Sequence, residues 1–302
     1  MAIPESQLET WSHQGSVRQS TTTYDTIKGA LEAADTGYAG KGTEIFLQGS
    51  YGNNTNIYAE SDVDVVIRLK STFHYDLERL TPQESESFQN KYNSATYDFR
   101  DFKTDVITAL ETSFGVEAVQ PGNKAIKIRP NGNRRSADVI VATQFRRYIR
   151  FHSSYLGILD EQYVSGIFLL ASDGERIVDY PKQHSENCTK KHQSTKELFK
   201  PMVRILKNLR SRLVENHLID EGIAPSYFIE GLLYNVPDDR FDGPYTSVFV
   251  AVIKWILDAD RSNFVCANEQ HALFGESGSA CWPANKCDLF LRALVNLWND
   301  WS

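Results

Sequence analysis

Residues 47–69 read LQGSYGNNTNIYAESDVDVVIRL and place two acidic side chains, Asp62 and Asp64, inside an otherwise apolar strand pattern. Side chains two apart in a strand project to the same face, so Asp62 and Asp64 point together while Val63 and Val65 point the other way. Two neighbouring carboxylates repel each other, and a divalent cation is the simplest positive partner for both. The stretch therefore predicts a metal site at the start of a strand.

The turn before this strand begins with Gly49 and Ser50, directly after an apolar strand pattern. Glycine lets the backbone approach a phosphate closely, and exposed amides together with the Ser50 hydroxyl can bind phosphate oxygens. A glycine and a serine alone carry little information. Because an Asp-x-Asp pair follows twelve residues later in the next strand, they predict a turn that binds a triphosphate.

A third acidic residue, Asp138, opens the apolar strand pattern DVIVA after the basic turn NGNRR. A single carboxylate at the start of a strand is more often an edge or turn residue. Two-metal phosphoryl transfer, however, needs a third carboxylate, because each cation requires several oxygen ligands beyond those of the substrate. Since Asp62 and Asp64 already require a partner, Asp138 is the candidate for the third ligand.

Basic residues are concentrated in two segments of an acidic chain, whose net charge is -7. Residues 124–150 contain eight basic side chains against one acid, and residues 190–212 contain the same. Such clusters suit a small polyanion such as a nucleoside triphosphate, although solvated faces would explain them equally well. The acidic total argues against binding of long nucleic acid.

The apolar runs are too short to span a membrane, and the N-terminus lacks a basic region followed by an apolar one, so we expect a cytoplasmic protein. The four cysteines have no paired CxxC spacing, which predicts reduced thiols. His184, Cys188 and His192 fall at i, i+4 and i+8, but structural zinc takes four ligands. We therefore expect surface or loop packing for these three residues rather than zinc.

Hydrophobic patterning divides the chain into two halves of different kind. The first half predicts a helix over about 20–35, a strand pair with a long polar connection (TEIFLQG and SDVDVVIRL), and a helix that ends at Gly115. Two further strands and a hairpin with Asp173 and Gly174 at its turn complete a mixed sheet. From Thr195 onward the pattern is helical. We expect an α+β fold, with a mixed-sheet core and N-terminal helix over 1–185, a helical lobe over 186–302, and a ligand between them.

The order Gly49-Ser50, Asp62-x-Asp64, then Asp138 resembles the polymerase-beta-like nucleotidyltransferases. The runs DYPKQH (179–184), FKPMVRILKNLR (199–210) and PSYFIE (225–230) resemble more specifically the bacterial cGAS/DncV-like nucleotidyltransferases, the CD-NTases. The resemblance spans about residues 45–236. It implies a polymerase-beta-like core with a helical lobe, and synthesis of cyclic di- or trinucleotide second messengers from nucleoside triphosphates, ATP among them, in anti-phage (CBASS) defence.

The same resemblance implies a role for each candidate site residue. Two Mg2+ ions, for which Mn2+ can substitute, would be held by Asp62, Asp64 and Asp138. Triphosphate oxygens would be bound by Gly49, Ser50, Lys207 and Ser226, while Tyr227 would stack on a base.

The helix that carries Lys207 supports part of this assignment. Its polar stripe of Lys200, Arg204, Lys207 and Ser211 lies opposite the Leu/Met face and can face a ligand. Tyr227 could equally be a core residue, since aromatic side chains on helices usually pack.

Two other functions are compatible with parts of this pattern. The same fold could serve a nucleotidyltransferase that modifies a small molecule, a tRNA end or a protein, although Lys207 together with Ser226 and Tyr227 favours the messenger synthase. A nucleotide sensor without turnover is a third interpretation, and the intact set of three carboxylates argues against it. We expect a messenger synthase to work with CBASS accessory proteins and to require neither long nucleic acid nor a membrane.

Overall fold

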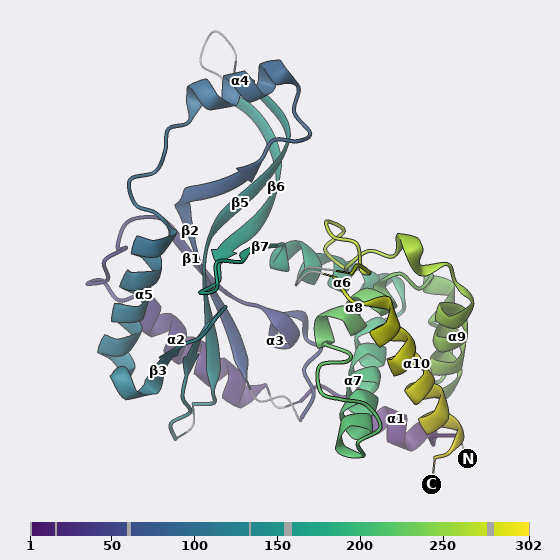
Figure 1. Cartoon of the computed structure of the whole chain (residues 1–302). Helices are drawn as coiled ribbons and strands as arrows, with labels where there is room; N and C mark the ends of the chain where they lie inside the picture. The colour runs from purple at the N-terminus through teal and green to yellow at the C-terminus, as the bar shows by residue number, and fades with distance from the viewer. Residues whose placement is uncertain are drawn as a thin grey trace. The chain divides into compact units, whose positions relative to one another are not determined.

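The computed structural model describes residues 2–15, 17–58, 62–132, 134–153, 159–276 and 281–301. Contacts between residues divide the chain into two compact units (Figure 1). The sheet unit comprises Gln19–Leu47 and Asp62–Tyr180, and the helical unit comprises Met1–Arg18, Gln48–Ser61 and Pro181–Ser302. Both units are discontinuous in sequence, so the chain crosses between them repeatedly.

Within the described residues the sheet unit contains one seven-stranded mixed sheet. Five strands lie in the order β1 (Thr43–Leu47), β2 (Val63–Asp76), β5 (Ala137–Ser153), β4 (Ile126–Ile128) and β3 (Val119–Pro121). Strand β5 also pairs with β6 (Leu159–Leu170), which pairs with β7 (Arg176–Asp179). Among these seven strands, β2 and β5 run parallel, and the other neighbouring pairs are antiparallel.

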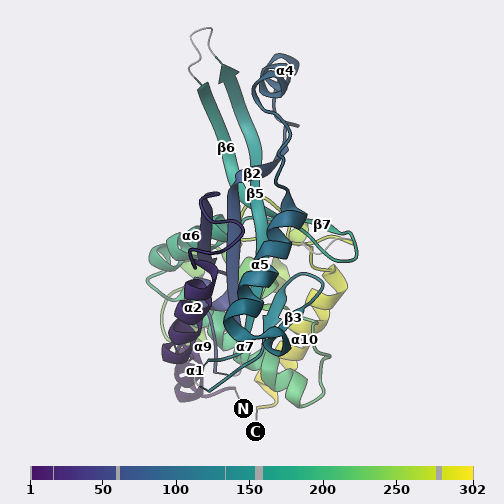
Figure 2. The same ribbon diagram turned by 90° about the vertical axis from the view of Figure 1, so that its left-hand side faces the viewer.

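Two helices, α2 (Arg18–Leu31) and α5 (Phe99–Phe114), cover the same face of the sheet (Figures 1 and 2). Helix α5 begins after Asp98, whose carboxylate accepts hydrogen bonds from two amides of the first turn. It ends at Gly115, which has φ +83° and is followed by the short 3-10 helix η1 (Val116–Ala118). An aspartate before the first turn and a glycine after the last are the local signals that start and stop a helix.

The far ends of β5 and β6 extend beyond the rest of the sheet and carry helix α4 (Pro82–Lys91) (Figure 2). Phe88 of α4 packs there with Tyr148 and Phe151 in a separate aromatic cluster. The sequence patterns predicted neither this helix nor the length of these strands, because β2, β5 and β6 continue past the apolar runs that identify them.

The helical unit contains α1 (Glu5–Ser12), α3 (Gly49–Asn53) and, among its described residues, five longer helices that follow the sheet unit in sequence. These are α6 (Pro181–Ser194), α7 (Phe199–Glu215), α8 (Ser226–Tyr234), α9 (Tyr245–Asp258) and α10 (Ala284–Asn299), with 3-10 helices η2 (Asp238–Arg240) and η3 (Arg261–Asn263) between them. The apolar face of α7 lies at the centre of one continuous core. The two ends of the chain lie side by side (Figure 1), and the rings of Trp11 and Trp301 are 5.6 Å apart.

The predicted α+β fold class is confirmed, and so are most predicted elements. Strands β1 and β2 pair as expected, Asp173 and Gly174 lie at the turn between β6 and β7, and α5 ends at Gly115. Helix α6 was not predicted. The single domain boundary predicted at residue 185 differs from the division by contacts, which adds residues 1–18 and 48–61 to the helical unit. No helix in the described part of the chain is long and apolar enough to cross a membrane.

Candidate active site

Three carboxylates lie on one face of the sheet at the start of the parallel pair β2–β5. Asp64 lies in register opposite Asp138, and register partners on neighbouring strands, about 4.8 Å apart, point to the same face of a sheet. Asp62 precedes β2 by one residue and shares the face of Asp64 by strand alternation. All three are only partly buried. The structure thus places the three acidic residues selected from the sequence, here called the carboxylate cluster, on the same face of the sheet.

The charge balance of this carboxylate cluster includes Lys127, a residue of the first basic segment that sequence reasoning did not single out. Lys127 lies opposite Asp138 on β4, and its ammonium is 3.4 Å from Asp62 Oδ2. Burial raises the pKa of Asp138, the charge of Asp62 raises it further, and Lys127 lowers it. Carboxylate oxygens are the ligand type that a hard divalent cation such as Mg2+ takes in proteins.

Gly49 and Ser50 begin helix α3, directly after β1 and Gln48. Gly49 has φ +64°, a left-handed conformation that glycine adopts without the steric cost of a side chain. The Ser50 carbonyl accepts a hydrogen bond from the Thr55 amide at 2.9 Å. Gly49 and Ser50 therefore belong to a short, internally bonded turn, the 49–55 turn.

The polar stripe on α7 is more deeply buried than its sequence pattern indicates. Lys207 is fully buried, and its ammonium donates a hydrogen bond to the Thr55 carbonyl at 2.8 Å. Lys200 is 5% exposed and donates to the Thr189 hydroxyl. Both lysines reach polar partners inside the helical unit, because a buried ammonium needs such partners. In this structure the contact of Lys207 is with the backbone of the 49–55 turn.

Ser226 and Tyr227 form the first turn of α8 and are both partly exposed. The Ser226 hydroxyl accepts a hydrogen bond from the Arg210 guanidinium at 3.1 Å. The Tyr227 ring stacks on His184, with centroids 5.0 Å apart and planes at 25°, and its hydroxyl accepts from Asn268 at 2.9 Å. One face of the Tyr227 ring is therefore occupied by an imidazole.

A buried polar cluster in the helical unit escaped sequence reasoning. The potential ligand atoms of His184, Cys188 and Glu230 lie within 4.8 Å of one another. His184 and Cys188 are on α6 and only 3% and 0% exposed, so the expectation of surface or loop packing was wrong for them. The overlooked signal is a lone glutamate, Glu230, in the apolar run YFIEGLL of α8. The cluster has three potential ligands, one short of a structural zinc site, and His192 is not part of it.

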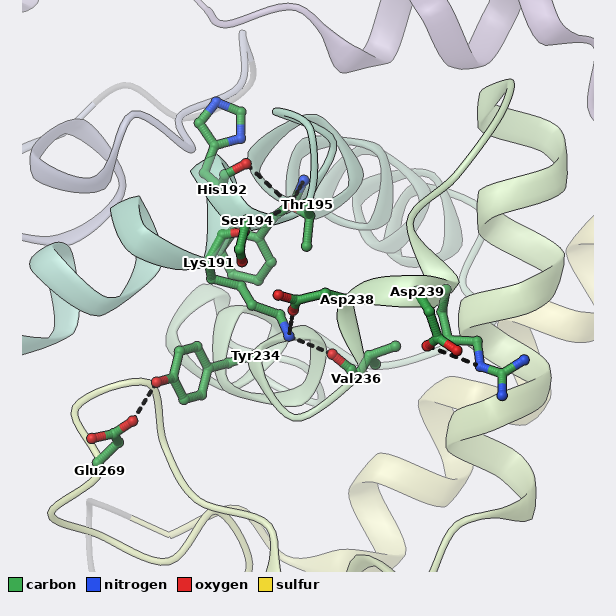
Figure 3. A network of polar contacts seen from close by, with 11 residues as sticks. Lys191, His192, Ser194, Thr195, Tyr234, Val236, Asp238, Asp239 and Glu269 are labelled. Atoms are coloured by element: carbon green, nitrogen blue, oxygen red, sulfur yellow. Dashed lines mark hydrogen bonds and ion pairs between the residues drawn. The ribbon is translucent and has the colours of Figure 1, made fainter.

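A second polar network fixes the other end of α6 (Figure 3). The Lys191 ammonium donates to the Val236 carbonyl and to the Asp238 carboxylate. Nearby, the Tyr234 hydroxyl donates to the Glu269 carboxylate. The side chain of Lys191 is 11% exposed. This network ties α6 to the segment that follows α8.

Comparison with known proteins identifies relatives of the whole chain. The family model of the cGAS/DncV-like nucleotidyltransferase C-terminal helical domain matches residues 186–299. The chain is 40% identical to the cyclic UMP-AMP synthase of Rhodothermus marinus (strain SG0.5JP17-172) and 37% identical to the cyclic nucleotide synthase CdnE01 of Staphylococcus haemolyticus, in each case over 100% of both chains. A structure of Rhodothermus marinus CdnE c-UMP-AMP synthase with Apcpp and Upnpp matches with a TM-score of 0.87 and 38% identity, covering 99% of this chain and 98% of that one.

The fold and these full-length matches together define an enzyme that transfers nucleotidyl groups. The chain belongs to the cGAS/DncV-like nucleotidyltransferases, and the relatives it matches are cyclic nucleotide synthases.

Proposed function

We propose that this enzyme converts nucleoside triphosphates, ATP among them, into a cyclic di- or trinucleotide messenger for anti-phage (CBASS) defence. The observation that carries the proposal is the placement of Asp62, Asp64 and Asp138 on one face at the start of β2 and β5. The matched Rhodothermus marinus synthase, solved with Apcpp and Upnpp, supports nucleoside triphosphates as substrates. We place the enzyme in the cytoplasm, with CBASS accessory proteins as its partners and without a need for long nucleic acid.

In this proposal Asp62, Asp64 and Asp138 hold two Mg2+ ions, for which Mn2+ can substitute. Cations bound there would lower the pKa of the acceptor ribose hydroxyl and offset the charge of the donor triphosphate. We assign Asp138 to the side of the attacking hydroxyl, because it stands on a different strand from the other two carboxylates. Lys127, paired with Asp62, keeps part of the cluster charge balanced.

The proposed reaction exchanges one bond at phosphorus in each step. The ribose hydroxyl oxygen of the acceptor bonds to the α-phosphorus of the donor, the bond to the pyrophosphate oxygen breaks, and the hydroxyl proton passes to water. In the last step a ribose hydroxyl of the linear product attacks the remaining triphosphate in the same way, which closes the ring and releases another pyrophosphate. The protein contributes mainly positioning and charge stabilisation, as is usual in phosphoryl transfer.

The substrate contacts in this proposal come from the helical unit. Gly49 and Ser50 bind triphosphate oxygens, Ser226 adds a hydroxyl, and the partly exposed Tyr227 stacks on a base. The contribution of Lys207 to triphosphate binding runs through the 49–55 turn, because its ammonium is bonded to the Thr55 carbonyl.

The central test supplies purified protein with the four nucleoside triphosphates and Mg2+ or Mn2+ alone. We expect pyrophosphate release and a labelled product that survives phosphatase, because a closed ring has no terminal phosphate. A phosphatase-sensitive product would show a linear oligonucleotide synthase instead. Triphosphates left intact, with turnover appearing only when a drug, tRNA or protein acceptor is added, would replace the proposal by a modifying enzyme.

Substituting Lys207 by Met should raise the KM for triphosphate roughly tenfold to hundredfold. It removes the hydrogen bond from the Lys207 ammonium to the Thr55 carbonyl, which holds the 49–55 turn, and a charge-assisted hydrogen bond contributes about 1.5–3 kcal/mol. Steady-state kinetics would be read beside the unfolding midpoint. Lys191→Met is the matched control. It removes another largely buried ammonium of the helical unit, one that bonds Val236 and Asp238 rather than the 49–55 turn. Equal KM values for both variants and the wild type would remove Lys207 from substrate binding.

A further inference from the structure

Thr55 makes three hydrogen bonds, each with a different part of the helical unit. Its amide donates to the Ser50 carbonyl at 2.9 Å, within the 49–55 turn. Its carbonyl accepts from the Lys207 ammonium of α7 at 2.8 Å. Its hydroxyl donates to the Glu230 carboxylate of α8. Thr55 is fully buried, so water does not compete for these bonds.

Glu230 is the centre of this contact set. Its carboxylate is 2% exposed and accepts hydrogen bonds from Thr55, from the Asn53 amide group at 2.9 Å and from His184 Nε2 at 2.6 Å. Two of these three donors belong to the 49–55 turn. The third belongs to α6, so one carboxylate joins the turn to two helices of the helical unit.

The contacts of the Glu230 carboxylate favour its ionised form in this buried position. Burial by itself would raise its pKa, but the hydrogen bond and charge of His184, the charge of Lys207 and the Thr55 hydroxyl together lower it. Burial likewise opposes a charged imidazole, yet contacts with Cys188 and Glu230 hold the pKa of His184 well above its usual value. Burial raises the pKa of the Cys188 thiol as well, although the neighbouring His184 lowers it. The pKa shifts of Glu230 and His184 thus favour an imidazolium–carboxylate pair.

The rest of the turn is held in the same way by other side chains. The Ser185 hydroxyl of α6 donates to the Gly52 carbonyl at 3.2 Å. The Arg204 guanidinium of α7 donates to the Asn54 carbonyl at 2.6 Å. Asn54 has φ +57°, a left-handed conformation that asparagine adopts more readily than most residues with a side chain, and it ends α3. Every described residue from Gly52 to Thr55 is thus bonded to a helix of the helical unit.

His184 connects this anchoring to the second proposed substrate contact. Its Nε2 donates to Glu230, and the face of its ring lies against Tyr227, with centroids 5.0 Å apart. A single imidazole therefore contacts both the carboxylate that holds the 49–55 turn and the tyrosine assigned to stack on a base.

We propose that Glu230, His184 and Thr55 are positioning residues that set the affinity of the enzyme for triphosphate without touching it. They hold the 49–55 turn in the conformation in which Gly49 and Ser50 present their backbone and hydroxyl groups to phosphate. This inference rests on the proposed function, which assigns triphosphate binding to Gly49 and Ser50. If the turn were released, the competent conformation would be only a fraction of the population, and the apparent affinity would fall by that fraction.

The decisive variants are Thr55→Val and Thr55→Ser. Valine keeps the shape of threonine but removes the hydroxyl that bonds Glu230, whereas serine keeps the hydroxyl. We expect Thr55→Val to raise the KM for triphosphate about fivefold to twentyfold at nearly unchanged kcat, since about one molecule in five to twenty would then hold the competent turn. Thr55→Ser should stay within about twofold of wild type by the same relation.

Glu230→Gln tests the centre of the contact set, and its combination with Thr55→Val tests whether the two residues act together. If they act through one bond, the double variant should raise KM by less than the product of the two single effects. Lys191→Met is the control for general destabilisation, because it removes an ion pair of the same helix α6 that does not involve the turn. It should lower the unfolding midpoint and leave KM unchanged.

Hydrogen exchange provides a readout that needs no substrate. Peptides that contain residues 49–55 should exchange faster in Thr55→Val than in Thr55→Ser, while peptides from α9 and α10 exchange as in wild type. Hydrogen exchange in the two Thr55 variants tests the positioning role even if Glu230→Gln does not fold. Unchanged KM and unchanged exchange in Thr55→Val would overturn the proposal, and so would a rise in KM that Lys191→Met reproduces.

The same experiments separate this proposal from the proposed function. If wild type binds a nonhydrolysable triphosphate but releases no pyrophosphate, the proposed catalysis fails, and a weaker binding constant in Thr55→Val still supports positioning. If wild type binds no triphosphate at all, the assignment of Gly49 and Ser50 is wrong and the positioning role is overturned with it.

Discussion

Asp64→Asn should abolish nucleotide synthesis while the protein stays folded, and Asp62→Asn should do the same. Each change removes one charged oxygen ligand from a cluster that requires several to hold two cations. Loss of a residue that merely supports a metal ligand typically costs 10–100-fold, so loss of a ligand itself should reduce pyrophosphate release by more than about 100-fold. The unfolding midpoint should hold or rise, because the carboxylates repel one another and the charge of Asp62 raises the pKa of Asp138.

The matched control is Asp76→Asn, at the far end of the same strand β2. Asp76 accepts from the Arg147 guanidinium at 3.1 Å and lies outside the carboxylate cluster. Its loss should affect stability modestly and activity little. We expect turnover to fall more than about 100-fold in both variants. If Asp62→Asn or Asp64→Asn kept more than about 1% of wild-type turnover, the metal assignment would be wrong.

Asp138→Asn should reduce kcat by a similar factor, more than about 100-fold, but leave triphosphate binding largely intact. The reason is that Asp138 is proposed to act on the side of the attacking hydroxyl. It lies on β5, in register with Asp64 of β2. Titration with a nonhydrolysable triphosphate and Mg2+ measures binding apart from chemistry. We expect a dissociation constant close to that of wild type.

Two results would contradict this role for Asp138. Complete loss of triphosphate binding would place the residue on the donor side, together with Asp62 and Asp64. Normal turnover in Asp138→Asn would show that Asp138 is an ordinary edge or turn residue, which was the alternative interpretation from the sequence. Because Asp138 is half-buried beside Asp62, the unfolding midpoint of the variant should again not fall.

Most of the fold prediction came from the alternation of side chains along strands and from local signals that end a helix. The spacing of Asp62 and Asp64 placed both on one face, and Gly115 marked the end of α5, because each depends on residues a few positions apart. Helix α6 was missed since its sequence, PKQHSENCTKKHQS, is largely polar and shows no apolar stripe. The extension of β5 and β6 was missed because polar and charged residues alternate irregularly along it.

By itself, the sequence determined the α+β class and the family, and it predicted the three carboxylates and the Gly49-Ser50 turn as site residues, because short-range spacing and motif order encode these features. Only the tertiary structure decided the pairing of Asp64 with Asp138 and the burial of Lys207, His184 and Cys188. The bond between Asn53 and Glu230 joins residues 177 positions apart. Such contacts arise when distant segments pack, and whether a lysine or glutamate lies in solvent or in a core depends on that packing. Periodicity along the chain describes which residues share a face but not what that face meets.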